Sequence, residues 1–569
     1  MKQNNLWILV LITIIITGAT LRLVGINWDQ NQHLHPDERF LTMVTQALTW
    51  PKSFTMYFST STSPANPNNY GYPFYVYGTF PLFITKIASQ LVNLDSYNGI
   101  TLVGRFLSAG FDTLIIYFVW GISLNIFKNK ITAILSAFFY SICVLPIQLA
   151  HFYAVDTFMV ACLYGSIYLL HKYLQHHNFT HSLVLVSLTG FIFGLSASSK
   201  ISALLFLPIV AGFFVFKLVK TKNWFQVFTC GLIFSILTFI SLHVAQPYLF
   251  NGFVKLNPKI LASWQQLKSF DDPTGWFPPA VQWIRSIKIL FPLENTAFWG
   301  LGLILFIVAV LGIVRSFFYL KNNPETGFHL LWILGLFIYQ GLQFAKPIRY
   351  FYPFYPSLAV ISGPVLYILL SRPKNILLKI LVLLLLIGWP LSFISIYSRP
   401  HSRVVATKWI YSHIPSGSTL SCEHWDDCLP LGGSGPYKFV EFPLYNPDSP
   451  QKVIQIQSLL KQTDYLILSS NRLYGSIMTV PEKYPITTKF YSDLFSGRLG
   501  FSKIAEFSSR PNLPLPGFQF CLTPWFVNYG KIAFPSQECP LPGVSFVDDY
   551  ADELWTVYDH PKVIIFKKT

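Results

Sequence analysis

The adjacent carboxylates Asp37 and Glu38 are the groups in this sequence best placed to do chemistry. They follow His33, His35 and Pro36 in the run His33-Leu34-His35-Pro36-Asp37-Glu38. Proline is favoured at the first position of a helix, where the helix dipole and the free backbone N–H groups keep nearby carboxylates ionised. An ionised carboxylate can act as a general base toward a hydroxyl group. The same run is also typical of a well-made helix start with no chemical role.

A metal site is the other functional interpretation of this run. Imidazole and carboxylate groups are common metal ligands, and His33, His35, Asp37 and Glu38 supply both kinds. Their spacing matches no metal signature, however, and Pro36 limits how closely the side chains converge. We therefore expect neither a catalytic metal nor another cofactor.

A third acidic position is Asp156, which follows His151 and Tyr153 between two apolar segments. A carboxylate at this position is suited to cap the helix that begins there. Capping does not exclude chemistry, because a capping carboxylate at the mouth of a bundle can still face a cavity. The sequence therefore predicts that Asp37, Glu38 and Asp156 are the catalytic carboxylates.

Several cations stand at the ends of apolar segments. They are Arg105, Lys200, Lys346 and Arg349. Charges at the edge of a bilayer are costly and usually mark a substrate path or a partner, although long side chains also extend to lipid headgroups. Arginine suits a forked contact with phosphate and lysine a point contact. The sequence predicts a site that holds a phosphate and a hydroxyl together, with Lys200, Arg349, Tyr350, Arg105 and His35 as substrate-binding residues.

The composition indicates what kind of protein must position these groups. Of the 569 residues, 52% are hydrophobic and only 12% are charged, about half the charged fraction of a soluble domain. A soluble protein of this length has too little interior to bury so much apolar surface. The composition excludes a soluble enzyme, a disordered protein and a collagen-like fibre. The formal charge of +16 is then expected on the cytoplasmic side of a membrane, and no nucleic-acid partner is expected.

Apolar segments of about 20 residues are long enough to cross a bilayer as helices. Eleven candidates lie at residues 6–26, 101–126, 131–149, 157–174, 182–198, 201–219, 224–245, 297–320, 328–346, 351–371 and 375–397. The first is interpreted as an uncleaved span, since no convincing cleavage site follows it. A further apolar stretch from Phe74 to Val92 is interrupted by Pro81 and Lys86 and is expected to lie in the interface or dip in without crossing. The fold class is thus an all-α polytopic membrane bundle of about eleven transmembrane helices.

Short basic loops give this bundle an orientation. Lysine and arginine near span ends are retained in the cytoplasm, and they recur in every second loop after Lys2. We therefore expect a multi-pass protein of the plasma membrane with a cytoplasmic N-terminus. Residues 27–100 and 246–296 would form the large outer loops. Residues 398–569 would also face outward.

The hydropathy falls sharply after Tyr397, so we expect a membrane domain over residues 1–397 and an extracytoplasmic domain over 398–569. Short helical and strand patterns, separated by proline and glycine, predict a small α/β fold for the second domain. It holds Cys422, Cys428, Cys521 and Cys539. Two disulfides, most simply Cys422 with Cys428 and Cys521 with Cys539, fit the outer side, although four cysteines allow three pairings and unpaired thiols remain the alternative.

Four motifs together resemble a known family. They are His-Pro-Asp-Glu at residues 35–38, Asp156, the Gly-Leu run that ends at Lys200, and the run Arg349-Tyr350-x2-Pro353-x2-Pro356. Their order is similar to that of polytopic, lipid-carrier-dependent glycosyltransferases with the C-type membrane fold (GT-C). Protein O-mannosyltransferases and the lipid A aminoarabinose transferase have this fold. Weaker matches include Gln282-Trp283, Trp299-Gly300-Leu301-Gly302 and Glu423-His424-Trp425-Asp426-Asp427.

The resemblance implies a reaction and its participants. Asp37 would be the base, Glu38 and Asp156 would support the acceptor or sugar, and Lys200 and Arg349 would contact the carrier phosphate. A sugar would move from a polyprenyl-phosphate donor to an acceptor hydroxyl on a protein, lipid or glycan at the outer face, with inversion. The partners would be this donor, this acceptor and membrane lipids. The main alternative is a polytopic lipid or solute transporter or flippase, because charges within spans also mark transport paths.

Overall fold

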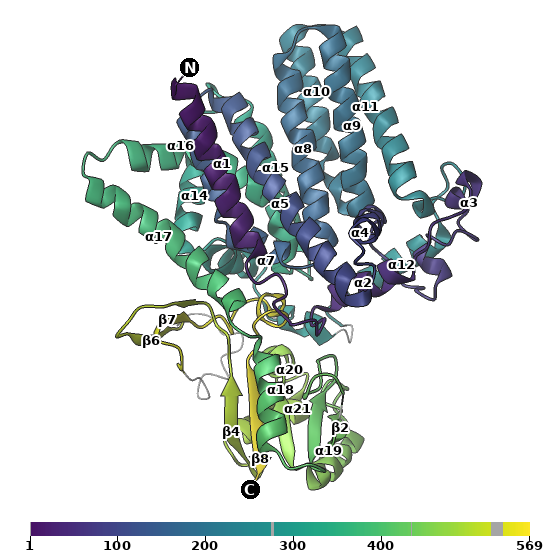
Figure 1. Cartoon of the computed structure of the whole chain (residues 1–569), viewed down its shortest axis with the longest axis vertical. Coiled ribbons are helices and arrows are strands. Elements are labelled where there is room, and N and C mark those ends of the chain that lie inside the picture. Colours follow the sequence, from purple (N-terminus) through teal and green to yellow (C-terminus); the bar gives the residue numbers. More distant parts are fainter. Residues whose placement is uncertain (1, 275–277, 434, 525–538) are drawn as a thin grey trace.

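The protein consists of a helical bundle at one end and a mixed α/β region at the other (Figure 1). This arrangement comes from a computed structural model, which describes residues 2–274, 278–433, 435–524 and 539–569. The N-terminus lies at the end of the bundle far from the α/β region (Figure 1). A membrane crossed by the bundle would therefore separate the N-terminus from the α/β region.

The bundle is formed by long apolar helices. They are α1 (Lys2–Leu23), α5 (Tyr97–Phe127), α6 (Lys130–Ser141), α7 (Val144–Ala150), α8 (Val155–Gln175), α9 (Phe179–Ser199), η2 (Ile201–Phe206), α10 (Leu207–Thr221), α11 (Trp224–Ala245), α14 (Leu303–Phe318), α15 (Thr326–Leu342), η6 (Ile348–Phe354), α16 (Tyr355–Ser371) and α17 (Ile376–Ile394). Shorter elements lie between them: α2 (Pro36–Ala47), α3 (Phe54–Phe58), η1 (Pro67–Asn69), α4 (Phe80–Leu91), η3 (Pro247–Leu249), α12 (Pro258–Ser269), η4 (Pro278–Trp283), α13 (Leu290–Glu294) and η5 (Asn295–Gly300).

The number of candidate spans is smaller than the eleven predicted. Among the described residues, 7 helical segments are long and apolar enough to cross a membrane, or up to 8 if α6 and α7, which meet at a bend of 56°, form one span. The other three predicted spans correspond to α8, α14 and α15. The last two are apolar helices of only 16 and 17 residues. Helix α8 packs between α5 and α9 with most of its residues buried, so it needs no apolar face toward lipid.

The interrupted stretch between residues 74 and 92 forms only α4, a helix of 12 residues. As expected, it is not among the candidate spans. It lies with α2 and α12 at the end of the bundle nearest the α/β region (Figure 1). These short helices build the surface on which the predicted site residues meet.

The α/β region begins after α17. Its elements are η7 (Ser395–Ser398), α18 (Ser402–His413), β1 (Thr419–Glu423), β2 (Lys438–Phe442), α19 (Pro450–Gln462), β3 (Tyr465–Leu468), α20 (Arg472–Ile477), α21 (Pro485–Phe495), β4 (Phe501–Phe507), β5 (Asn512–Leu513), β6 (Gln519–Leu522), β7 (Gly543–Phe546), α22 (Glu553–Thr556) and β8 (Val563–Lys568). The main sheet has the order β2-β1-β3-β8-β4, and β5-β7-β6 form a second sheet.

Helices cover both faces of the main sheet. Strand β3 is buried along its whole length, as expected for a continuous apolar run in a covered sheet. Leu466 and Leu468 pack toward Tyr491 of α21, whereas Tyr465 and Ile467 pack toward Ile410 of α18. Successive side chains of a strand point to opposite faces, so one strand contributes to two separate cores.

Both predicted disulfides are present. Cys422 is bonded to Cys428 and Cys521 to Cys539. The first closes a short loop directly after β1, whereas the second joins β6 to the segment before β7. The pairing between near neighbours is therefore confirmed.

The segment before β8 fixes the α/β region to the bundle. Trp555 is fully buried with its ring centroid 4.9 Å from that of Phe393 in α17. Gln148 of α7 donates to the backbone oxygen of Trp555 (2.8 Å), and Tyr397 donates to Asp559 (2.7 Å). Buried polar contacts of this kind hold the two regions in one geometry.

Glu423 makes the stability of the α/β region dependent on pH. Burial raises the pKa of Glu423 to about 8, and nearby Asp426 adds to this, although the hydrogen bond from Tyr491 opposes it. The folded protein therefore binds a proton that the unfolded chain releases at lower pH. Stability falls as pH rises from the ordinary glutamate pKa to about 8 and then levels off. We expect Glu423→Gln to flatten this dependence in thermal unfolding across that range. An unchanged slope in the variant would contradict the assignment.

Candidate active site

Helix α2 sets the directions of the first carboxylate pair. The Nδ1 atom of His35 accepts the backbone N–H of Glu38 at 3.2 Å and caps the helix, and Pro36 occupies its first turn. Burial lowers the pKa of His35 to about 4, so the capping imidazole is neutral. Neighbouring residues of a helix point about 100° apart because a turn takes 3.6 residues. Asp37 and Glu38 therefore face different partners.

Glu38 belongs to a buried ion cluster. Its carboxylate accepts from Arg105 at 2.5 and 2.8 Å and from the backbone N–H of Tyr153 at 2.8 Å. Arg105 also donates to Asp29 at 2.8 and 3.1 Å. The side chains of Glu38 and Arg105 are both fully buried. This cluster ties the loop before α2 and the first turn of α2 to α5, and it holds Asp37 in position.

Removing the cation of this cluster should destabilise the protein. Arg105→Met leaves the carboxylates of Asp29 and Glu38 buried without their partner, which typically costs about 3–5 kcal/mol. We expect a clearly lower Tm in thermal unfolding of the detergent-solubilised protein. Arg498→Met is the matched control, because Arg498 pairs with Asp493 on the surface and is 66% exposed. Equal Tm values for the two variants would show that the cluster does not support the fold.

Asp37 points away from this cluster and forms an ion pair with Arg349 of η6. Burial alone would raise the pKa of Asp37, but Arg349, His35 and a hydrogen bond from the Tyr77 hydroxyl hold it well below its ordinary value. Burial and the Asp37 charge in turn raise the pKa of Tyr77, so Tyr77 stays a hydrogen-bond donor. Asp37 is consequently a carboxylate across the physiological pH range.

A second ion pair lies beside the first. The Nζ atom of Lys200, just after α9, donates to Asp156 in the first turn of α8 at 2.8 Å. Lys200 also lies 4.8 Å from the centroid of the Tyr350 ring, and Arg349 lies 5.8 Å from it. Tyr350 therefore stands between the two cations and brings the two ion pairs into one site.

These residues line one end of a cavity of about 360 Å³. Tyr77, Asp156, Lys200, Arg349 and Tyr350 form its polar end. Apolar side chains line the remainder: Met159, Leu163, Ile201, Leu205, Trp264, Leu267, Trp332, Leu336 and Pro353, among others. Three lining residues, Leu205, Leu267 and Tyr339, are 44%, 40% and 50% exposed. Exposed apolar side chains therefore border this cavity, which we call the donor cavity after the role proposed for it below.

One hydrogen-bond donor at the polar end of this cavity lacks an acceptor. The Nε atom of Arg349 is buried and has no hydrogen-bond partner among the described residues. An unsatisfied buried donor is costly, and a guanidinium has the geometry to bind an oxyanion. Arg349 lines the donor cavity, so its guanidinium lies close to where an anionic oxygen could bind.

The structure brings together five of the eight predicted site residues. Asp156, Lys200, Arg349 and Tyr350 line the donor cavity, and Asp37 is paired with Arg349 beside it. Glu38, Arg105 and His35 instead make contacts that hold the first turn of α2. The sequence analysis missed Tyr77, Trp264 and Trp332. Tyr77 lies in an aromatic run, Tyr70 to Tyr77, which was the available indication.

No three His, Cys, Asp or Glu side chains are arranged to hold a metal ion within the described parts of the chain. His33, one of the suggested ligands, instead contacts Asn98 at 2.8 Å.

A polytopic helical bundle followed by an α/β region, with a charged, apolar-walled cavity among the elements of the bundle, fits a membrane glycosyltransferase of the GT-C class. Residues 81–244 match the family model described as dolichyl-phosphate-mannose-protein mannosyltransferase. This match identifies the chain as a glycosyltransferase that uses a lipid-phosphate-linked sugar donor. It argues against the transporter alternative. No curated protein has a significantly matching sequence.

Solved structures with TM-scores above 0.5 show the same fold at low sequence identity. The Archaeoglobus fulgidus oligosaccharyltransferase tethered with an acceptor peptide containing the NVT sequon is 13% identical, with a TM-score of 0.55, 99% of this chain covered and 88% of that chain. The Archaeoglobus fulgidus oligosaccharyltransferase AglB, in complex with an inhibitory peptide and a dolichol-phosphate, is 13% identical at a TM-score of 0.54, with 86% and 72% covered. ArnT from Cupriavidus metallidurans bound to undecaprenyl phosphate is 12% identical at a TM-score of 0.43, with 84% and 95% covered.

Proposed function

We propose that this enzyme transfers a sugar from a polyprenyl-phosphate donor to an acceptor hydroxyl at the outer face of the membrane, with inversion. The observation that carries the proposal is the Arg349 side chain, which lines a largely apolar cavity and whose buried Nε lacks a partner among the described residues. A phosphate oxygen would satisfy this donor, and the apolar lining would accommodate the first prenyl units. The exposed apolar side chains that border the cavity suit a substrate that cannot leave the bilayer.

Asp37 is the base in this proposal. Its carboxylate takes the proton from the acceptor hydroxyl while the hydroxyl oxygen forms a bond to C1 of the sugar. The bond between C1 and the phosphate oxygen breaks, and its electron pair remains with the lipid phosphate. One displacement from the face opposite the phosphate inverts C1. Because Arg349 contacts both Asp37 and the proposed phosphate position, it aligns the base with the leaving group.

Lys200 and Asp156 have complementary roles. The Lys200 ammonium adds a second positive charge beside Arg349 and stabilises the charge that develops on the departing phosphate. Asp156 holds Lys200 in place and can accept hydrogen bonds from the sugar hydroxyl groups. Glu38, Arg105 and His35, which the sequence suggested as direct participants, act in this proposal as positioning residues for Asp37.

The test is a transfer assay on the full chain in lipid vesicles. Polyprenyl-phosphate sugars are supplied as donors, and free polyprenyl phosphate and glycosylated product are measured together. We expect both to appear in equal amounts, with the product anomer inverted relative to the donor by NMR. Movement of intact donor across the bilayer without release of polyprenyl phosphate would instead indicate a flippase. Retention at C1 would contradict the single displacement.

The proposed orientation has a separate test. The basic loops predict a cytoplasmic N-terminus, and the two termini lie at opposite ends of the molecule (Figure 1). We therefore expect a C-terminal reporter enzyme that is active only outside the cytoplasm to be active. An inactive C-terminal fusion with an active N-terminal fusion would reverse the orientation.

A further inference from the structure

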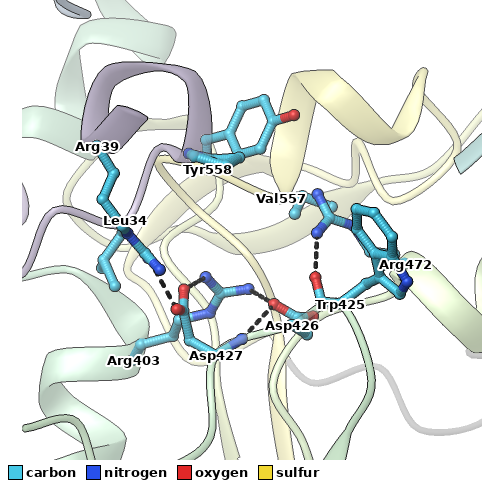
Figure 2. A pocket seen from close by; sticks show the side chains of 10 residues that line it. Leu34, Arg39, Arg403, Trp425, Asp426, Asp427, Arg472, Val557 and Tyr558 are labelled. Carbon is cyan, nitrogen blue, oxygen red and sulfur yellow. Dashed lines mark hydrogen bonds and ion pairs between the residues drawn. The ribbon is translucent and has the colours of Figure 1, made fainter. Parts of the chain in front are cut away.

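A second cavity lies between α2 and the α/β region. It has a volume of about 260 Å³ and is lined by Leu34, Pro36, Arg39, Arg403, Trp425, Asp426, Asp427, Arg472, Val557 and Tyr558. Figure 2 shows Arg39 and Trp425 on opposite sides of this cavity, with Asp426 and Asp427 between them. Its lining comes from the bundle and from the α/β region, so it exists only when the two are docked.

A short, firmly held loop supplies three of these residues. The disulfide between Cys422 and Cys428 closes the loop that carries Trp425, Asp426 and Asp427. Asp426 pairs with the buried Arg403, and Arg472 donates to the backbone oxygen of Trp425 at 2.5 Å. Trp425 has a φ of 68°, a left-handed conformation that is uncommon for a bulky residue. The loop thus presents the indole ring, 45% exposed, from a fixed backbone.

Two charged side chains of the second cavity can still form hydrogen bonds with a ligand. Asp427 joins the two regions, because it accepts from Arg39 at 2.9 Å and from Arg403 at 2.8 Å. The Nε atom of Arg39 donates a hydrogen bond to the backbone oxygen of His33. Its Nη1 atom has no hydrogen-bond partner among the described residues. The Arg39 and Asp427 side chains are 38% and 22% exposed. A guanidinium donor and a carboxylate acceptor therefore face the cavity side by side.

The catalytic carboxylate lies between the two cavities. Asp37 lines neither, but its partner Arg349 lines the donor cavity and its neighbour Pro36 lines the second one. Tyr558, also in the second cavity, packs on the capping ring of His35 at 4.2 Å and interacts electrostatically with Asp37. A ligand held in the second cavity would thus approach Asp37 from the side opposite the lipid.

We propose that the second cavity binds the acceptor and that this acceptor is a carbohydrate, so that the enzyme extends a glycan. This proposal rests on the proposed function. Adjacent hydroxyl groups of a sugar both donate and accept hydrogen bonds, which suits neighbouring guanidinium and carboxylate groups. The electron-rich face of the Trp425 indole attracts the weakly positive C–H face of a sugar ring. An extended peptide would instead need a free strand edge or a row of pockets.

The size of the cavity agrees with this ligand. Pockets for drug-sized ligands measure about 300–1,000 Å³, and this cavity is slightly smaller, at about 260 Å³. It therefore fits one or two sugar rings at the end of a chain. The remaining glycan would extend toward solvent past Arg39 and Trp425.

The experiment is saturation-transfer NMR on the purified full chain in detergent. The probes are methyl glycosides of mannose, glucose and galactose, with a peptide containing serine and threonine as the rival probe. We expect at least one glycoside to bind, with an affinity about fivefold lower in Trp425→Ala, since loss of one aromatic contact costs about 1 kcal/mol. Trp425→Phe, which keeps a ring, should retain most of the affinity. Trp224→Ala is the matched control, because Trp224 is 69% exposed at the start of α11 and lines neither cavity.

Each outcome decides the proposal. Absence of glycoside binding, binding unaffected by Trp425→Ala, or binding of the peptide alone would overturn it. Glycoside binding should persist in Asp37→Asn, because that variant removes the base and not the cavity. If glycosides bind through Trp425 but no sugar transfer is found, the proposed function fails while the cavity assignment stands. If transfer proceeds with an unchanged KM for acceptor in Trp425→Ala, the transferase stands and the acceptor site is elsewhere.

Discussion

Replacing Asp37 by asparagine is expected to lower sugar transfer by about 10²- to 10⁴-fold, the usual contribution of a general base. Asparagine has the same shape as aspartate but cannot accept the proton of the acceptor hydroxyl. The effect should fall on kcat, because Arg349 and Lys200, which bind the lipid phosphate in our proposal, remain. The measurement is the initial rate of polyprenyl-phosphate release in vesicles, with the KM for donor determined in parallel.

A surface carboxylate provides the control for this variant. Glu482 pairs with Arg285, and its side chain is 56% exposed. Glu482→Gln makes the same change from carboxylate to amide without touching the site, and it should transfer sugar at the unaltered rate. Near-normal turnover in Asp37→Asn would remove Asp37 from its role as base. A loss that appears only in the KM for donor would make Asp37 a positioning residue for Arg349.

Hydropathy predicted the bundle well and the number of spans less well. A lipid-facing helix must be apolar, so α1, α11 and α17 stand out in the sequence. Helix α8 was counted for the same reason, yet it lies inside the bundle with Asp156 and His171 buried in it. Hydropathy along the sequence does not distinguish a helix that contacts lipid from one that contacts only other helices.

The site shows a related limit. The sequence placed Asp37 and Glu38 together because they are adjacent, but helix geometry sends one toward Arg349 and the other toward Arg105. Which of the two neighbouring carboxylates points toward Arg349 depends on how α2 is rotated against α5. That rotation is set by buried contacts such as Thr42 with Thr101 at 2.9 Å, far apart in the chain.

The outer cations show why charge alone is insufficient. Lys346 and Arg349 are both cations at the end of an apolar segment, but only Arg349 was predicted to bind substrate, and only Arg349 of the two lines the donor cavity. Lys346 donates to the backbone oxygens of Phe344 and Gln343 at 3.0 and 3.5 Å. Burial lowers the pKa of Lys346 to about 8, which suits a role within its own loop. Two cations only three residues apart thus have different roles: Arg349 lines the donor cavity, whereas Lys346 supports its own loop.

Arg349→Met should have the second large effect, a loss of about 10²- to 10³-fold in kcat, as expected when one group that stabilises developing charge is removed. The guanidinium is the only described donor that contacts Asp37 and also has an unsatisfied buried N–H at the polar end of the donor cavity. Its removal weakens both the hold on the base and the stabilisation of the leaving phosphate. Arg349→Lys should recover part of the rate, since lysine restores the positive charge but not the forked N–H donors of the guanidinium.

The pH profile of these variants separates this role from a general loss of structure. In the native protein Arg349 and His35 overcome burial and keep the pKa of Asp37 low, so activity should show no acid limb from Asp37 near neutral pH. Without the guanidinium, burial raises the pKa of Asp37, and the base becomes protonated at a higher pH. The acid limb of the pH profile of kcat should therefore move to higher pH in Arg349→Met and back to lower pH in Arg349→Lys. A profile in Arg349→Met that superimposes on the native one, at any absolute rate, would mean that the ion pair does not set the charge of the base.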